Sequence, residues 1–463
     1  MKTDFLKDLK DFSNELAKED NILVVSHHDA DGICSCGIAL DLLHYLKKNV
    51  NFLVMKQLDS NTVKKIKDFS YDVILFTDFG SGQLSLIERN NLGKYYIIDH
   101  HVPEDKYDLQ INPHFYGYDG GLDISGGGMT YLVAKSLKRD SMAHIAVVSA
   151  IGDMQDNGGE LHSLNRNILE DAVSQNTIKV KRDLSIFGRQ SRPISQMLAY
   201  SSEPVIPGLT GNPDKCSEFI HNLGIPLKDD GKWRHYVDLS WEDRKKLTTA
   251  LYIYLLNLNT PEFIIQRLIG EVYTLLKEEK KTELRDAKEY STMLNACGRQ
   301  DKPEIGVKIC LGERGETLHT ARRILEKHRQ MLKEGLNYLT SKGTKEMEYL
   351  YYFDSDGKIK ESIIGVITGM AYGAQIIPPN KPILAFAIDK DDENLLKVSS
   401  RANWNLVRKG IHLGKAMHEG CKIIGGEGGG HNIAAGARIP KDKKEEFLEI
   451  VNKIFKDQRK VNF

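Results

Sequence analysis

Residues 21–32 read NILVVSHHDADG, and the architecture can be inferred outward from this segment. The apolar run at 21–26 predicts a buried strand, and Gly32 permits a tight turn into a helix that we expect to reach about residue 48. Side chains alternate between faces in an extended chain, so His27, Asp29 and Asp31 are expected to lie on one side. One imidazole and two carboxylates form a good ligand set for a divalent metal ion.

The pattern of an apolar strand followed by a helix recurs along the first hundred residues. NFLVMK at 51–56, DVILFTD at 72–78 and KYYIIDHH at 94–101 read as strands, with helix-like segments between them. This alternation predicts an α/β fold with a parallel sheet and helices on both faces. In such sheets the chemistry gathers at the carboxyl ends of the strands.

Polar side chains follow several of these strands. Asp78 ends one strand, DHH at 99–101 ends the next, and Asp153 follows a helix of small residues. Each group alone would more simply be a helix cap or a turn former. Together they crowd carboxylates at one edge of the sheet, where they repel each other unless a cation lies between them. Oxygen and imidazole ligands suit Mn²⁺, Mg²⁺ or Zn²⁺, and a pair of such ions activates water for phosphate-ester hydrolysis.

The order of these motifs resembles a known family. SHHDADG at 26–32, TDFG at 77–80, DHH at 99–101 and GDMQDN at 152–157 are similar to the four motifs of the DHH phosphoesterases. GGEGGGHNIAAG at 425–436 resembles the signature of that family's associated C-terminal domain. The stretches GRQSRPI at 188–194 and LAYSSEPVIPGLTGN at 198–212 resemble the archaeal RecJ-like nucleases, including the GINS-associated nuclease.

The resemblance implies two Mn²⁺ ions in one active site, with Mg²⁺ as the alternative. Asp29 would bind one ion, Asp31 the other, and Asp78 both. His100 and Asp153 would complete the second site.

Two further roles follow from the resemblance. His101 would contact the scissile phosphate as a catalytic residue beside Asp78, and Asp99 would orient the histidines. Many members of the family carry a histidine four residues before the first aspartate, where this chain has Val25. We expect His27 to take over as the metal ligand, because it lies on the same face of the strand.

Substrate binding is expected mainly in the last part of the chain. Consecutive glycines allow backbone N–H groups to approach an anion closely, and the histidine that follows them adds a donor. Two arginines near 190 are weaker candidates. The expected substrate-binding residues are Ser400, Arg401, Gly429, Gly430, His431, Arg189 and Arg192. SGGG at 125–128 is either a phosphate cradle or a plain helix cap.

We expect four segments: a DHH metal-binding domain at 1–200, a mostly helical insertion at 201–310, a long linker helix at 311–342 and a smaller C-terminal α/β domain at 343–463. Lys and Arg together number 64, as do Asp and Glu, so any phosphate-binding surface must be local. The six cysteines form no CxxC pair, and neither a signal peptide nor a membrane span is expected. A cytoplasmic location follows from these features.

The leading functional hypothesis is a single-strand-specific exonuclease that cuts DNA or RNA from an end, in replication or repair. The first alternative is a phosphodiesterase for oligonucleotides or other small substrates. The second is a replisome scaffold that binds GINS and has secondary nuclease activity. GINS is also an expected partner of the nuclease itself, through the insertion.

Overall fold

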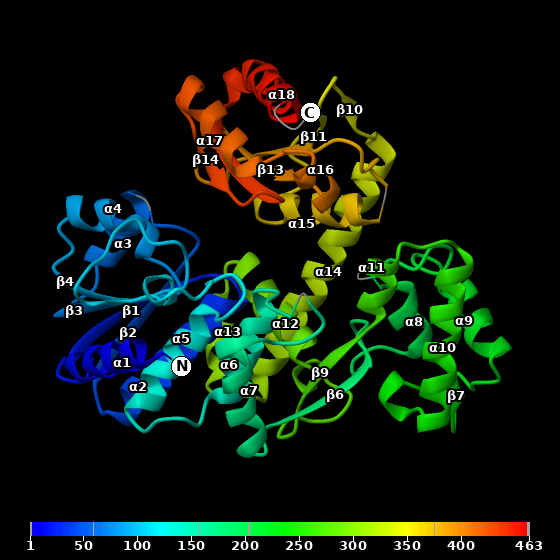
Figure 1. The fold of residues 1–463 in the computed structure, drawn as a ribbon, viewed down its shortest axis with the longest axis horizontal. Helices are drawn as coiled ribbons and strands as arrows, with labels where there is room; N and C mark the ends of the chain where they lie inside the picture. Colours follow the sequence, from blue (N-terminus) through cyan, green and yellow to red (C-terminus); the bar gives the residue numbers. More distant parts are fainter. Residues whose placement is uncertain (1, 59, 157, 202–203, 375, 461–463) are drawn as a thin grey trace. The chain divides into compact units, whose positions relative to one another are not determined.

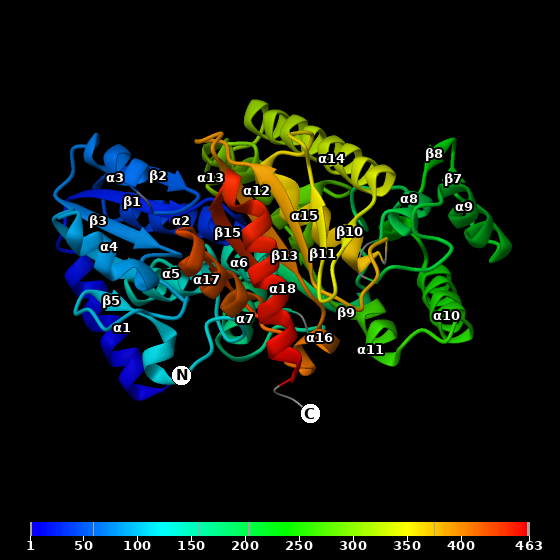
Figure 2. The same cartoon turned by 90° about the horizontal axis from the view of Figure 1, so that it is seen from above.

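The computed structural model describes residues 2–58, 60–156, 158–201, 204–374 and 376–460. It divides into two compact units, Met1–Leu325 and Glu326–Phe463. Figures 1 and 2 show the elements of each unit. Within the described residues, no helix combines the length and the apolar composition that crossing a membrane requires.

The first unit is built on a five-stranded parallel sheet, drawn in blue in Figure 1, with the order β2-β1-β3-β4-β5. Its strands are β1 (Asn21–His27), β2 (Asn49–Met55), β3 (Val73–Thr77), β4 (Lys94–Ile98) and β5 (Gln110–Ile111). Alternate residues of β1 enter different cores, because Val24 packs on one face of the sheet and Val25 on the other. The sheet is therefore buried on both faces, as expected for parallel strands.

Helices cover both faces, which confirms the predicted α/β class. The larger core holds side chains from α1 (Thr3–Leu16), α2 (Ala30–Tyr45), α5 (Gly126–Ser136), α6 (Ala143–Gly152), α7 (Ser163–Ser174), α12 (Ala287–Arg299) and α13 (Pro303–Cys310). The opposite face is covered by α3 (Ser60–Lys67) and α4 (Leu84–Arg89).

The turn after β1 differs from the extended chain that we expected. Strand β1 ends at His27, and Asp29 is the N-cap of α2, accepting a hydrogen bond from the Gly32 N–H at 3.0 Å. A Cβ atom at Gly32 would lie 2.2 Å from the His27 carbonyl oxygen, so only glycine fits this turn. Asp31 therefore lies in the first turn of a helix. It still reaches the carboxyl edge of the sheet, because α2 starts there.

Within the first unit, a helical insertion is joined to the rest through a pair of antiparallel strands, β6 (Ile178–Leu184) and β9 (Ile269–Leu275). It has its own hydrophobic core and appears in green in Figure 1. Its elements are α8 (Ile194–Ala199), α9 (Pro213–Asn222), α10 (Trp241–Asn257), α11 (Glu262–Ile265) and the short hairpin β7 (Lys228–Asp229) and β8 (Lys232–Trp233). Helices α12 and α13 fall within the range 201–310 expected for the insertion, but they pack in the core of the five-stranded sheet.

The long helix α14 (Glu316–Lys342) runs from the first unit into the second. The second unit has a six-stranded mixed sheet in the order β10-β11-β12-β13-β15-β14. Its strands are β10 (Lys345–Glu346), β11 (Tyr351–Asp354), β12 (Ile383–Ile388), β13 (Leu395–Arg401), β14 (Glu427–Gly430) and β15 (Ala434–Pro440), and its helices are α15 (Glu361–Gly373), α16 (Trp404–Arg408), α17 (Leu413–Ile424) and α18 (Lys444–Lys460). The glycines at 428–430 thus form part of an edge strand.

Candidate metal centre

Asp78 lies at the centre of the polar cluster at the carboxyl end of β3. Its backbone has φ +63°, a left-handed conformation that is uncommon for a residue other than glycine. Its side chain is 1% exposed, and neither oxygen accepts a hydrogen bond from any residue that the structure describes. Burial, together with the charges of Asp31 and Asp29, raises the pKa of Asp78 well above its usual value. A buried carboxylate in this condition is unfavourable unless a cation compensates it.

One group of potential metal ligands consists of His27, Asp29 and Asp78. His27 Nδ1 lies 3.0 Å from Asp29 Oδ2 and 3.7 Å from Asp78 Oδ2. The ligand atoms of His27, Asp29 and Asp78 all lie within 4.8 Å of one another. Val25 is fully buried in an apolar core, whereas His27 is partly exposed at the strand end. His28 contacts the His27 ring, with its Nδ1 3.1 Å from His27 Nε2. Burial lowers the pKa of His28 to about 3.

A second group contains Asp31, His100 and Asp153, whose ligand atoms also lie within 4.8 Å of one another. His100 Nδ1 lies 2.6 Å from the Gly120 carbonyl oxygen and must donate to it, because a carbonyl only accepts. The other nitrogen, Nε2, then faces Asp78 Oδ1 at 3.2 Å and Asp31 Oδ2 at 3.4 Å. Burial lowers the pKa of His100, but Asp153 and Asp31 outweigh it and raise the pKa to about 9. A proton and a metal ion therefore compete for this nitrogen.

The N-terminus of α5 holds Asp31 in place. The N–H groups of Gly126 and Gly127 donate to its two oxygens, each at 2.8 Å, and the Ser149 hydroxyl donates to Oδ1. A Cβ atom at Gly126 would lie 2.4 Å from Asp78 Oδ1, so a side chain here would displace that carboxylate. Ser125 is the N-cap of the helix, accepting from the Gly128 N–H at 3.1 Å. The glycines thus bind a carboxylate of the protein itself.

Asp99 binds the backbone and one of the two histidines that follow it. Its Oδ1 accepts from the His100 N–H at 2.7 Å and lies 2.8 Å from His101 Nδ1, and its Oδ2 accepts from the Ser81 N–H at 3.0 Å. Burial lowers the pKa of His101, but the hydrogen bond to Asp99 raises it to about 9. Asp99 therefore orients His101, whereas the Gly120 carbonyl orients His100. The His101 side chain is half-exposed.

Two supporting residues, Gln155 and Ser149, were not predicted from the sequence. Gln155 donates to Asp153 Oδ2 at 2.8 Å, and burial raises the pKa of Asp153 to about 6. Gln155 lies in the fourth motif and could have been suspected from that position, whereas Ser149 has no motif around it. Asn157, the last residue of the fourth motif, lies outside the described residues.

The expected substrate-binding residues of the second unit occupy neighbouring strands. Ser400 and Gly430 both pair with Ala435, one on each side of β15, and the buried Ser400 hydroxyl donates to the Ala435 carbonyl at 3.0 Å. Gly429 pairs with Gly436 one position further along.

Arg401 and His431 lie beside this row. Arg401 lies against α15, where a Cβ atom at Gly365 would be 2.8 Å from its Nη2. His431 is exposed at the turn between β14 and β15, and its N–H donates to the Ala434 carbonyl at 2.9 Å. Because Arg401 pairs with Ala434, the two candidate side chains belong to the same end of the sheet.

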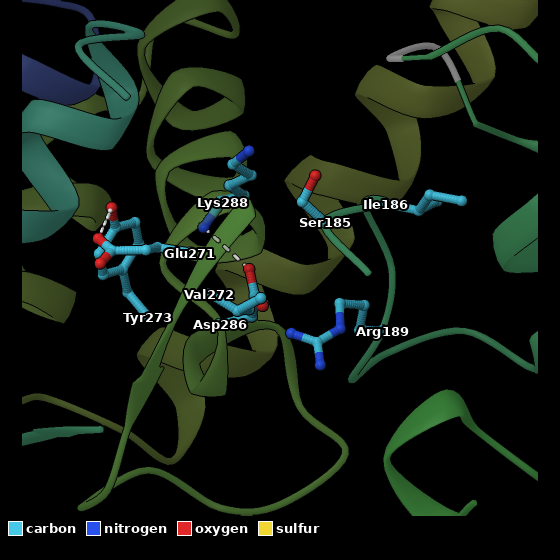
Figure 3. A pocket seen from close by; sticks show the side chains of 8 residues that line it. All are labelled: Ser185, Ile186, Arg189, Glu271, Val272, Tyr273, Asp286 and Lys288. Carbon is cyan, nitrogen blue, oxygen red and sulfur yellow. Dashed lines mark hydrogen bonds between the residues drawn. The ribbon is translucent and has the colours of Figure 1, made fainter. Parts of the chain in front are cut away.

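The arginines near 190 lie at the base of the insertion. Arg189 lines a small pocket (Figure 3) and is only 7% exposed, with its Nη2 2.5 Å from Asp183 Oδ2 and its guanidinium 4.9 Å from the Tyr236 ring centre. The other residues that line the pocket are Ser185, Ile186, Glu271, Val272, Tyr273, Asp286 and Lys288. This internal ion pair, rather than substrate, accounts for the position of Arg189. The Arg192 guanidinium stacks on Phe187 and Tyr200, 4.8 and 5.3 Å from their ring centres.

Comparison with known proteins agrees with this arrangement. Residues 21–152 match the N-terminal domain of the DHH family, residues 186–269 match the DHH-CID domain and residues 348–457 match the DHHA1 domain. An uncharacterized protein of Methanocaldococcus jannaschii is 32% identical over 446 residues, which are 94% of each chain.

Two solved structures share the fold at low sequence identity. Exonuclease RecJ bound to manganese is 15% identical, with a TM-score of 0.56 over 96% of this chain and 94% of that one. CDC45 from Entamoeba histolytica is 12% identical, with a TM-score of 0.63 over 97% of each chain. The predicted family is thus confirmed: the chain belongs to the DHH phosphoesterases and has their RecJ-like fold.

Proposed function

We propose that this protein is a metal-dependent exonuclease that hydrolyses phosphodiester bonds of single-stranded DNA or RNA from an end, in replication or repair. The observation that carries the proposal is Asp78, a buried carboxylate that accepts no hydrogen bond from the described residues and lies among side chains that could hold metal ions. The similar structure of exonuclease RecJ bound to manganese supports both the ion and the reaction.

In this proposal Asp78 would help to hold both ions. His27 and Asp29 would complete one site, and Asp31, His100 and Asp153 would complete the other. Carboxylates with imidazoles suit Mn²⁺, with Mg²⁺ as the alternative. Bound ions would polarise the phosphoryl oxygen and lower the pKa of a bound water.

The remaining residues position the substrate. His101, held by Asp99 at 2.8 Å, presents a half-exposed imidazole that is suited to the scissile phosphate. In the second unit Arg401 and His431, with the backbone at Gly429 and Gly430, would hold the nucleic-acid strand by its phosphates. The buried Ser400, whose hydroxyl donates to the Ala435 carbonyl, would support this row from within the sheet. Arg192 remains a candidate for the same role.

The exposed surface of the insertion suggests that it binds another protein. Helix α10 buries Leu247, Leu251 and Leu255, yet it also exposes an apolar stripe, with Tyr252 at 44%, Ile253 at 50% and Leu256 at 48%. A second apolar face on one helix is typical of a protein contact. We infer that the insertion binds a replication protein, and GINS is the partner we propose.

Hydrolysis of end-labelled strands tests the proposed reaction. DNA and RNA single strands should be shortened in Mn²⁺, and EDTA should abolish the reaction. Exclusive cleavage of dinucleotides, with no attack on longer strands, would favour the small-substrate phosphodiesterase instead.

A binding assay with purified GINS tests the partner. Just beyond the paired ends of β6 and β9, the Ser185 N–H donates to the Leu268 carbonyl at 2.9 Å. Residues 186–267 can therefore be replaced by a short glycine linker while α12 and α13 stay. We expect this deletion, and the triple change Tyr252→Ser, Ile253→Ser and Leu256→Ser, to abolish binding. Undiminished binding by the folded deletion variant would contradict the assignment.

A further inference from the structure

Helix α12 packs directly against the segment that carries the first metal ligands. The Asn295 carboxamide oxygen accepts a hydrogen bond from the Ala30 N–H at 3.0 Å, across 265 residues of sequence. One turn further on, a Cβ atom at Gly298 would lie 1.7 Å from the His28 carbonyl oxygen, so the helix touches this segment without an intervening side chain. Helix α12 lies outside all three ranges that match the family domains.

The contact is important because Ala30 lies between two of the proposed metal ligands. Ala30 is the first residue of α2, with Asp29 before it and Asp31 after it. Its N–H is one of the donors that a helix N-terminus leaves without an intrahelical partner. Asp29 uses Oδ1 for the Gly32 N–H, and its Oδ2 lies 3.0 Å from His27 Nδ1. The hydrogen bond from Asn295 therefore fixes the backbone of the residue that joins the carboxylates of Asp29 and Asp31.

We propose that Asn295 is a positioning residue for the metal centre, because its hydrogen bond to the Ala30 N–H fixes the backbone between the proposed ligands Asp29 and Asp31. The proposal deepens the proposed function and rests on it. The side chain of Asn295 is not itself a ligand. Losing an outer contact of this kind typically costs roughly ten- to a hundredfold in metal affinity.

Direct measurement of Mn²⁺ binding by calorimetry tests this role without relying on activity. Asn295→Leu removes the acceptor at similar size, Asn295→Asp keeps an oxygen in the same place, and Thr292→Val is the matched control one turn earlier in α12. Asn295→Ser, whose hydroxyl is too short to reach Ala30, is a second loss variant if the leucine variant does not fold. Melting in EDTA measures the stability of each variant without metal.

We expect Asn295→Leu or Asn295→Ser to weaken Mn²⁺ binding about tenfold. Asn295→Asp and Thr292→Val should stay within about threefold of the wild type, and the melting temperatures in EDTA should not follow this order. Wild-type affinity in a folded loss variant would overturn the role of Asn295, as would an equal loss in Thr292→Val. If the wild type binds no Mn²⁺ at all, the proposed metal centre is wrong. If it binds Mn²⁺ but the variants do not differ, only the inference about Asn295 fails.

Discussion

His100 Nε2 lies 3.2 Å from Asp78 Oδ1, and the other nitrogen of the same ring is bound to the Gly120 carbonyl at 2.6 Å. The ring therefore has one orientation, with its other nitrogen directed at a buried carboxylate that has no hydrogen-bonding partner among the described residues. This arrangement links folding with chemistry. The buried Asp78 carboxylate is unfavourable without a cation, and the same carboxylate would be a ligand for one.

Asp78→Asn tests that link through stability as well as activity. The variant removes a buried carboxylate whose pKa is raised by burial and by neighbouring carboxylates, so its melting temperature in EDTA should exceed that of the wild type. Mn²⁺ should raise the melting temperature of the wild type and not that of the variant. Strand hydrolysis should fall by several orders of magnitude. The exposed Asp105→Asn should behave like the wild type in every measurement, and a metal-induced rise retained by Asp78→Asn would rule out a shared ligand.

His27 and His28 are expected to differ, although they are adjacent. His27→Ala should raise the Mn²⁺ concentration for half-maximal activity by at least about tenfold, because a ligand should matter no less than an outer contact. His28 contacts the His27 ring, and its own nitrogen points at that ring, so His28→Ala should have a smaller effect. A titration of activity against Mn²⁺ separates the two. Equal shifts would mean that the first site is built from other residues.

Substitution of Arg401 or His431 should slow the hydrolysis of long substrates only. Each loses a charge-assisted phosphate contact when changed to alanine, which costs about 1.5–3 kcal/mol, or roughly ten- to a hundredfold in strand hydrolysis. Hydrolysis of a small chromogenic phosphodiester and Mn²⁺ binding should stay unchanged, whereas Asp153→Ala should lose both hydrolytic activities. Arg408→Ala and His418→Ala, at exposed positions of the same unit, are the controls. Loss of metal in His431→Ala would place this histidine in the catalytic centre.

The buried carboxyl group of Glu289 should make the free energy of unfolding depend on pH. It is fully buried at the start of α12 and accepts from the Gln190 and Ser191 N–H groups at 2.9 and 3.2 Å. Burial, and then the charge of Asp286, raise its pKa to about 8 from an ordinary value of 4.5. The folded state therefore holds an extra proton between these values, and stability should fall as the pH rises through that window, by up to about 1.4 kcal/mol per pH unit.

Thermal melting between pH 5.5 and 8.5 measures this dependence. Glu289→Gln should flatten the decline, because the amide does not titrate. Glu313→Gln, at an exposed position, should leave the decline as it is. A slope in Glu289→Gln equal to that of the wild type would mean that another group binds the proton.

The sequence was sufficient to predict the sheet and its polar edge, because apolar runs form strands and the carboxyl ends of parallel strands meet at one edge. It did not place Asp31 correctly, since Asp29 caps a helix two residues after β1 and ends the extended chain. Asn295 has no motif around it, and its partner lies 265 residues away, so only the folded chain brings them together. The strand at 427–430 was missed because glycine has little preference for strands, and pairing with β15 stabilises it.

The most direct test of the central claim compares two forms of one single strand, linear and covalently circular, incubated with the protein and Mn²⁺. We predict that the linear form is shortened progressively from one end, that the circle remains intact, and that Asp78→Asn leaves both untouched. Cleavage of the circle, or an intact linear strand under conditions in which Mn²⁺ is shown to bind, would contradict the assignment of this protein as an exonuclease.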